Sequence, residues 1–308
     1  MAADKFEVGL VQMCCSPEPD DNVERAVAHV REAARRGAQV ICLPELFRTQ
    51  YFCQREDTAL FDLAEPIPGP STARFCGVAR ELKVAIVVSL FERRAPGLYH
   101  NTVVVIGSDG EVRGNYRKMH IPDDPLYYEK YYFTPGDFTP EGVSPEGFKS
   151  FDLEEGSVGT LICWDQWYPE GARLTALQGA NVIFYPTAIG WHPAEKAEWG
   201  EAQYDAWVTI QRGHAIANGV YVGAVNRVGH ETGNIRGNEA KGAGLDFWGG
   251  SFLADPFGRI IARASDDKEE ILIGTVDVKL QEEIRRNWPF LRDRRIDAYG
   301  PITQRFGK

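Results

Sequence analysis

The 308-residue sequence is short of basic residues, with 34 Lys and Arg against 44 Asp and Glu and a formal net charge of -10 at pH 7. An acidic chain lacks the positive face that binds nucleic acid or an anionic membrane surface, so we expect neither as a partner. No apolar run approaches bilayer-spanning length, and the start of the chain has no basic segment followed by an apolar core. These absences predict a cytoplasmic protein whose substrate is small and either neutral or cationic.

Motifs for cofactors and metals are also missing. The sequence has no Gly-x-Gly-x-x-Gly or phosphate loop, and no Cys/His/Asp cluster with metal-ligand spacing, so we expect no cofactor and no metal. The cysteines are scattered without Cys-x-x-Cys spacing, which in a chain of this size is typical of free thiols in a reducing compartment. They stand at positions 14, 15, 42, 53, 76 and 163.

Strand and helix signals alternate along the whole chain, and the apolar content of 44% is that of an ordinary globular enzyme. Two β-α-β halves with added antiparallel strands predict an α/β fold of two packed mixed sheets flanked by helices, in one domain over residues 1–287. Residues 288–308 are rich in Arg, Pro and aromatic residues and are not periodic, so we interpret them as a separate tail. The predicted strands are 6–12, 39–43, 84–91, 101–106, 111–116, 158–162, 181–185 and 220–225, and the predicted helices are 21–36, 73–82, 169–178 and 198–218.

Local signals set two finer expectations. Asp21 and Glu24 have capping-box spacing at the start of the first helix, and Gly37 is placed to end it. Strands at 250–254, 259–264 and 271–276 are expected to finish the chain as a β-meander.

Three apolar, strand-like runs each end near a reactive side chain: Glu45, Lys118 and Cys163. A thiol attacks as a thiolate, and its pKa falls beside a cation or at a helix N-terminus. Cys163 has both features available, because it closes a strand shortly before a helix that begins with proline. Such a turn also places a backbone N–H, for example that of Trp164, where an oxyanion can be bound.

Each of these residues also has a plainer interpretation. Cys163 could be core packing, Glu45 a salt-bridged strand end, and Lys118 one of a solvated basic group with Arg117 and His120. A Cys–His pair is a further alternative, but no spacing singles out one of the six histidines, at positions 29, 100, 120, 192, 214 and 230.

Taken together and in this order, the segments Leu43-Pro44-Glu45-Leu46, Tyr116-Arg117-Lys118-Met119-His120 and Leu161-Ile162-Cys163-Trp164-Asp165 resemble the motifs of the nitrilase superfamily of carbon–nitrogen hydrolases. The resemblance covers essentially the full chain. It implies a four-layer α-β-β-α sandwich with a Glu–Lys–Cys triad formed by Glu45, Lys118 and Cys163. It also implies a second glutamate near the site, Glu129, and a homo-oligomer, a dimer or larger ring, assembled through the outer helices and the tail.

Within the superfamily, residues 120–137, 163–173 and 184–190 resemble enzymes that hydrolyse carbamoylated diamines, which implies a small cationic carbamoyl-amine substrate. Related hydrolases of carbamoyl amino acids place arginines just after the nucleophile to hold a carboxylate. Here Gln166 and Trp167 stand there, so a bidentate clamp is missing and an aromatic face is offered to an alkyl-ammonium chain. The residues expected to contact substrate are Trp164, Asp165, Gln166, Trp167, Asp124 and Glu195, with Asp123 as a further candidate for the distal ammonium.

Other branches of the superfamily remain alternatives: a hydrolase of N-carbamoyl amino acids or β-ureidopropionate, an ω-amidase, or a true nitrilase. A binding protein on an inactive fold is a third reading, although all three triad residues are present.

Overall fold

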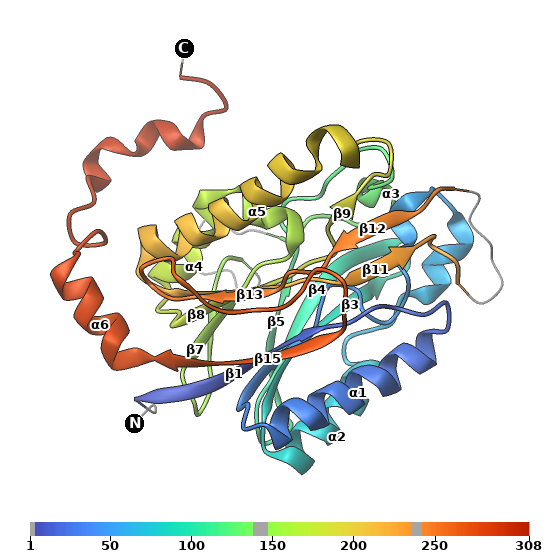
Figure 1. Ribbon diagram of the computed structural model, residues 1–308, viewed down its shortest axis with the longest axis horizontal. Helices are drawn as coiled ribbons and strands as arrows, with labels where there is room; N and C mark the ends of the chain where they lie inside the picture. The colour runs from blue at the N-terminus through green and yellow to red at the C-terminus, as the bar shows by residue number, and fades with distance from the viewer. Residues whose placement is uncertain (1–3, 138–146, 236–241, 308) are drawn as a thin grey trace.

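Two six-stranded sheets pack face to face in the computed structural model, which describes residues 4–137, 147–235 and 242–307 (Figure 1). Residues 1–3, which belong to the segment assessed for a signal peptide, and residue 308, the last of the predicted tail, lie outside the described residues.

The first sheet is built around three parallel strands, β1, β2 and β3, with antiparallel strands added on both sides. Helices α1 (Pro19–Arg35) and α2 (Pro70–Leu82) cover its outer face (Figure 1). In spatial order its strands are β15 (Glu270–Asp277), β1 (Lys5–Gln12), β2 (Val40–Cys42), β3 (Ala85–Ala95), β4 (Leu98–Ile106) and β5 (Val112–Arg117).

The second sheet repeats this scheme with parallel strands β7, β8 and β10 at its centre. Helices α4 (Pro169–Leu177) and α5 (Lys196–Asn218) lie on its outer face, so the layers run helix, sheet, sheet, helix (Figure 1). The predicted α-β-β-α sandwich is therefore confirmed. In spatial order its strands are β14 (Ile260–Arg263), β13 (Phe252–Ala254), β10 (Tyr221–Val225), β8 (Val182–Pro186), β7 (Ser157–Thr160) and β6 (Ser150–Asp152).

The main core lies between the sheets, where fully buried aliphatic and aromatic side chains of both sheets meet. Gly223 on β10 shows how closely they approach: a Cβ there would lie 2.8 Å from the Phe184 ring and 3.2 Å from Leu10 of the first sheet. Each fully buried Val, Leu, Ile or Phe side chain contributes about 1.5–3 kcal/mol to folding. The packed sheets therefore hold the residues at the ends of their strands in fixed positions.

Shorter elements gather at one end of the sandwich. A three-stranded sheet joins β11 (Val228–Glu231), β12 (Leu245–Trp248) and β9 (Gly190–Trp191). Helix α3 (Glu129–Tyr132) and the 3-10 helices η1 (Phe52–Gln54) and η2 (Thr58–Leu63) share a hydrophobic cluster with β12, and the 3-10 helix η3 (Cys163–Trp167) lines a cavity with β9 and β12. The sequence signals did not predict these small strands, because each is too short to show alternation.

Two of the finer sequence predictions are wrong. Helix α1 begins at Pro19, and its N-cap Glu18 makes no side-chain cap bond, so Asp21 and Glu24 are not a capping box. Proline fixes its own φ for the first helical turn and thereby starts the helix earlier. The predicted meander is also broken, since β15 leaves β14 and pairs with β1 in the first sheet.

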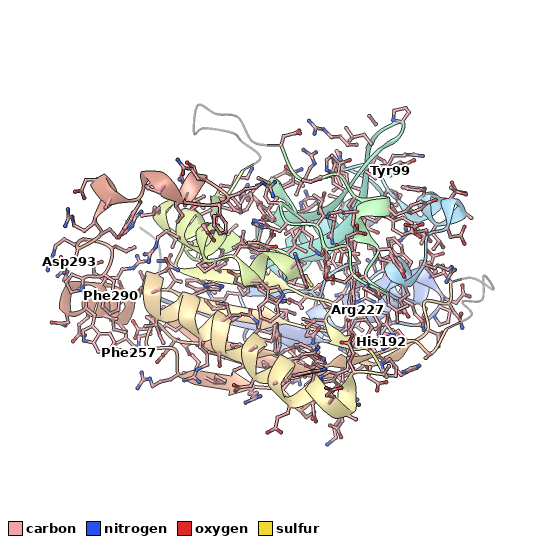
Figure 2. The ribbon with its side chains drawn as sticks, turned by 90° about the horizontal axis from the view of Figure 1, so that it is seen from above. Tyr99, His192, Arg227, Phe257, Phe290 and Asp293 are labelled. Atoms are coloured by element: carbon pink, nitrogen blue, oxygen red, sulfur yellow. The ribbon has the colours of Figure 1, made fainter. Side chains whose placement is uncertain are left out.

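The last elements extend from the body of the molecule. Helix α6 (Val278–Asn287) is followed by the 3-10 turns η4 (Ile296–Ala298) and η5 (Gly300–Thr303), which project beyond the sandwich (Figure 1). Figure 2 shows Phe290 beside Phe257 at this end and His192 toward the other; the Phe257 and Trp288 rings are 5.1 Å apart. Within the described residues, no helix combines the length and apolarity needed to cross a membrane. The division into a domain over 1–287 and a tail stays a prediction.

Candidate active site

A buried ammonium held between two carboxylates forms the centre of the site. Lys118 follows β5 directly, and its Nζ lies 2.8 Å from Glu45 Oε1 and 2.7 Å from Glu129 Oε2. Glu45 follows β2 after two residues, and Glu129 opens helix α3. All three side chains are at most 1% exposed, so the structure brings together residues that are 73 and 11 positions apart.

The two oxygens of the Glu45 carboxylate differ in their hydrogen bonding within the described residues. Its Oε1 accepts hydrogen bonds from Lys118 Nζ and from Asn101 Nδ2 at 2.6 Å. Its Oε2 is buried and has no hydrogen-bond partner within the described part of the chain. A buried, unpartnered carboxylate oxygen is costly unless a ligand or a transferred proton uses it, which makes Glu45 suited to act as a general base.

Cys163 begins η3 between β7 and α4, which is the strand–turn–helix position that the sequence predicted for it. Its φ of 43° is in the left-handed region, a conformation that costs a non-glycine residue about 1–3 kcal/mol and is concentrated at functional sites. The side chain is nearly buried but lines a cavity.

The protonation of Cys163 differs from the sequence expectation of a lowered pKa. Burial raises the pKa of the Cys163 thiol well above its usual value; the Glu45 carboxylate adds to the rise, and the nearby Lys118 ammonium does not offset it. The thiol is therefore protonated at rest and needs a base to remove its proton at the moment of attack.

The charges around Lys118 are mutually dependent. Burial alone would lower the pKa of Lys118, but the Glu129 and Glu45 carboxylates outweigh it and hold that pKa well above the usual value. Burial also raises the pKa of Glu129 to about 7, because Lys118 compensates only part of the desolvation. Lys118 thus stays a cation, and two carboxylates share its single charge.

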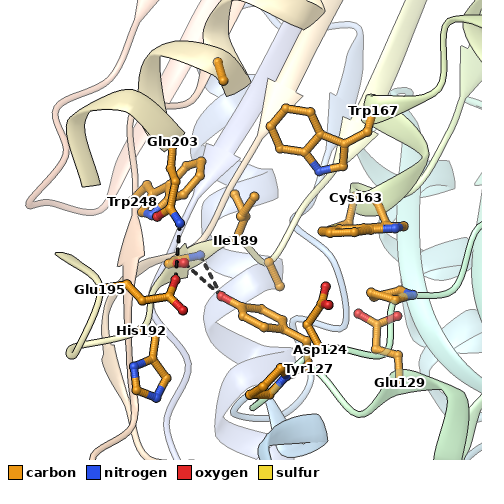
Figure 3. Close-up of a pocket in the computed structure, with 16 residues that line it drawn as sticks. Asp124, Tyr127, Glu129, Cys163, Trp167, Ile189, His192, Glu195, Gln203 and Trp248 are labelled. Carbon is orange, nitrogen blue, oxygen red and sulfur yellow. Dashed lines mark hydrogen bonds between the residues drawn. The ribbon is translucent and has the colours of Figure 1, made fainter. Parts of the chain in front are cut away.

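The cavity has a volume of about 390 Å³ and runs from Cys163 and Glu129 on one side to Glu195 and His192 on the other (Figure 3). Its wall is largely aromatic and aliphatic, and among its described lining residues none is Lys or Arg. The lining consists of Pro122, Asp124, Pro125, Tyr127, Glu129, Cys163, Trp164, Trp167, Ala188, Ile189, Gly190, His192, Glu195, Gln203, Ala206 and Trp248.

Four of the six residues expected to contact substrate line this cavity, namely Trp164, Trp167, Asp124 and Glu195, whereas Asp123 does not.

Asp165 and Gln166 do not agree with the expectation of substrate contact. Both are completely buried and lie outside the cavity lining. Gln166 Oε1 accepts a hydrogen bond from Trp207 Nε1 at 2.8 Å. The Asp165 carboxylate accepts from Tyr116, His120 and Ile162. The 3-10 turn of η3 directs these two side chains inward and leaves the two tryptophans facing the cavity.

A further set of residues supports the site without having given a signal in the sequence. Tyr51 donates from its hydroxyl to Glu129 Oε1 at 2.8 Å. The buried Arg227 donates to the backbone oxygens of Glu45 and Leu46 and pairs with Glu231 at 2.8 Å. Arg227 therefore clamps the loop that carries Glu45, in which Leu46 has a φ of 49°.

An α-β-β-α sandwich that presents a carboxylate, an ammonium and a cavity thiol at one end of its sheets is the arrangement of an enzyme that hydrolyses carbon–nitrogen bonds. The comparison with protein families agrees: the chain belongs to the carbon–nitrogen hydrolase family, whose model matches residues 7–286.

Several relatives are similar over nearly their whole length. The chain is 41% identical to N-carbamoylputrescine amidase of Oryza sativa subsp. japonica, with 97% of this chain and 94% of the relative covered. It is 35% identical to citrullinase of Francisella tularensis subsp. tularensis, over 98% and 99%. A crystal structure of a carbon–nitrogen hydrolase from Helicobacter pylori G27 has a TM-score of 0.90 at 43% identity, covering 98% of this chain and 99% of that one. This chain is thus a carbon–nitrogen hydrolase that acts on amide bonds.

Proposed function

We propose that this enzyme hydrolyses N-carbamoylputrescine to putrescine, carbon dioxide and ammonia, a step on a route to polyamines. The observation that carries the proposal is the charge distribution in the cavity: a thiol at one side, and the carboxylates Asp124 and Glu195 without any lining Lys or Arg within the described residues. A carbamoylated diamine has the matching features, an uncharged ureido group at one end and an ammonium at the other. The identity to plant N-carbamoylputrescine amidases supports the same substrate.

The proposed substrate would lie in the cavity with its ureido end at the thiol. Its ureido carbon would lie at Cys163, its methylene chain along Trp167 and Trp164, and its ammonium near Asp124 or Glu195. Aromatic faces attract cations and alkyl chains, so the tryptophans favour this chain over a polar one.

The mechanism gives each buried group its own role. Glu45 takes the thiol proton while Cys163 Sγ attacks the carbamoyl carbon, and the tetrahedral oxyanion is stabilised by Lys118 and by the Trp164 N–H. A well-placed donor of this kind contributes about 3–4 kcal/mol to the transition state. Glu45 then protonates the departing nitrogen and activates the water that hydrolyses the thioester-like intermediate. Glu129 keeps Lys118 charged and oriented.

Citrulline provides the sharpest substrate test, because it has the same ureido group and chain as N-carbamoylputrescine plus one carboxylate beside the ammonium. That carboxylate would face Asp124 and Glu195 without a cation to balance it. Like charges so placed cost several kcal/mol, so kcat/KM should favour N-carbamoylputrescine by about 10²-fold or more. A coupled ammonia assay with both substrates measures this ratio.

Matched variants identify the carboxylate that binds the ammonium group of the substrate. Asp124→Asn and Glu195→Gln should each be compared with Glu198→Gln, an exposed carboxylate of α5 outside the cavity lining. The variant that removes the ammonium partner should raise KM for N-carbamoylputrescine and narrow the preference over citrulline, whereas Glu198→Gln should change neither. Equal or better turnover of citrulline, or of N-carbamoyl-β-alanine, would instead favour another branch of the family.

We further propose that the enzyme works in the cytoplasm as a homo-oligomer joined through the tail after Asn287. The tail exposes apolar side chains that a monomer leaves in water, including Ile296 at 74%, Ile302 at 63% and Phe306 at 81%. Exposed apolar area of this kind is typical of a surface that binds a partner. Truncation after Asn287 should lower the mass measured by light scattering to that of a monomer, whereas an unchanged mass would exclude the tail as the contact.

A further inference from the structure

Within the described residues, the Asp165 carboxylate accepts four hydrogen bonds, all from groups within two residues of Lys118 or Cys163. Its Oδ2 accepts from Tyr116 Oη at 2.7 Å and from the backbone N–H of Ile162 at 2.9 Å. Its Oδ1 accepts from the backbone N–H of His120 at 3.0 Å and from His120 Nδ1 at 2.6 Å. The carboxylate is completely buried and lies outside the cavity lining, so it does not reach substrate.

These donors come from two segments that the fold must bring into register. Tyr116 and His120 stand two residues before and two residues after Lys118, and Ile162 directly precedes Cys163. Asp165 therefore joins the segment that carries the ammonium to the turn that carries the thiol. Lys118 has other backbone bonds, to Asn101 O at 2.9 Å and from Gly136 N at 3.0 Å, but these do not involve the Cys163 turn.

The backbone around Cys163 requires contacts of this kind to hold its conformation. Cys163 has a φ of 43°, and a residue in that region keeps its conformation only if its surroundings over-determine it. The bond from Ile162 N–H to Asp165 closes the turn on one side of Cys163, while the bonds from Tyr116 and His120 attach the same carboxylate to the first sheet.

The chemistry of the position calls for a carboxylate. An ionised carboxylate only accepts hydrogen bonds, and at Asp165 both oxygens face two donors each. An amide of the same shape would have to direct its NH₂ group at two of those donors, whichever way it turned. Asn at this position would therefore fill the same volume as Asp165 but could not accept all four hydrogen bonds.

We propose that Asp165 is a positioning residue that sets the Lys118 ammonium and the Cys163 thiol relative to each other. The inference rests on the proposed roles of Cys163 and Lys118. His120 helps to hold Asp165 in place. Its ring is half-buried, donates through Nδ1 to Asp165, and stacks on Tyr168 with ring centres 3.7 Å apart.

The first test is kinetic. Asp165→Asn should lower kcat about 10²-fold with KM changed by less than about 3-fold, because a displacement of about 1 Å between reacting groups costs on that order while the cavity wall stays intact. The control is Asp255→Asn, since Asp255 is an equally buried carboxylate that accepts from the N–H groups of Phe257 and Arg259 at a remote turn. It should lower the melting temperature and leave kcat unchanged.

The second test is rescue at His120. Asn places its amide nitrogen where Nδ1 of histidine lies, so His120→Asn should keep kcat within about 3-fold of the parent. His120→Ala removes the donor and should lower kcat about 10-fold, as should Tyr116→Phe, in line with the loss of one hydrogen bond to a charged acceptor.

The outcomes of these two tests decide whether Asp165 is a positioning residue. A normal kcat in Asp165→Asn, or a raised KM with kcat unchanged, would overturn it. If Asp165→Asn does not fold, equal kcat values for His120→Asn and His120→Ala would overturn it instead. A failure here is distinct from a failure of the proposed function: loss of turnover in Cys163→Ala with normal turnover in Asp165→Asn removes only the positioning role.

Discussion

The Cys163→Ala variant is expected to hydrolyse N-carbamoylputrescine at the background rate, a loss on the order of 10⁴-fold or more in kcat, because the reaction has lost its nucleophile. Cys163→Ser should be nearly as inactive, since a hydroxyl is harder to deprotonate than a thiol. An ammonia-release assay on the purified variants measures the loss, and equilibrium binding of putrescine tests whether the cavity survives.

A second cysteine separates this effect from a loss of packing. Cys42 on β2 is as buried as Cys163, and burial likewise raises its pKa well above the usual value. Cys42→Ala should cost some stability through the small cavity it leaves and should keep normal kcat. Substantial turnover in Cys163→Ala would remove the thiol from the mechanism.

The Glu45→Gln variant is expected to lower kcat by about 10²–10⁴-fold, the usual contribution of a general base, with KM little changed. The effect should be large because the Cys163 thiol is protonated at rest and Glu45 Oε2 is free to take its proton. The amide can still accept from Lys118 and Asn101 through its remaining oxygen, so folding should persist. Steady-state kinetics with N-carbamoylputrescine measure both constants.

The matched control for Glu45 is Glu155→Gln. Glu155 is another buried carboxylate whose Oε2 has no hydrogen-bond partner within the described residues, and it lies in the turn before β7, outside the cavity lining. Its variant should keep normal kcat. A Glu45→Gln enzyme with unchanged kcat would require a different proton acceptor for Cys163.

Much of the framework of the site could be predicted from the sequence, because strong local patterns marked it. The runs before Glu45, Lys118 and Cys163 are buried strands or strand ends, and buried apolar runs bounded by turn residues are readily recognised. The order of the three motifs then identified the family. The Lys118–Glu129 ion pair followed from the resemblance alone, since a Glu beside Lys130 has no distinctive pattern.

What could not be predicted depends on contacts between distant segments. Tyr51, Asn101 and Arg227 reach the site from parts of the chain with no shared motif. Gln203 lines the cavity only because α5 packs where it does, and His192 because it follows β9. The direction of a pKa shift is equally non-local. A cation near Cys163 suggested a lowered pKa for the thiol, but the burial of its side chain has the larger effect and raises that pKa.

The predicted substrate contact of two polar residues beside Cys163 fails for a related reason. Asp165 and Gln166 follow Cys163 directly, which suggested substrate contact, but the 3-10 geometry of η3 turns them into the protein. The strand β15 was likewise placed in the wrong sheet, since its sequence shows that it is a strand and not which neighbour it pairs with.

The proposed reaction requires Cys163 to form a covalent bond to the carbamoyl carbon. Mass spectrometry of enzyme quenched in acid during turnover of N-carbamoylputrescine tests this bond most directly. We expect that the peptide containing Cys163, and no other cysteine peptide, gains a carbamoyl group if putrescine leaves first, or an aminobutylcarbamoyl group if ammonia leaves first. The adduct should disappear when substrate is exhausted. An unmodified Cys163 peptide at every quench time, or an adduct on another residue, would contradict the role of Cys163 as the nucleophile.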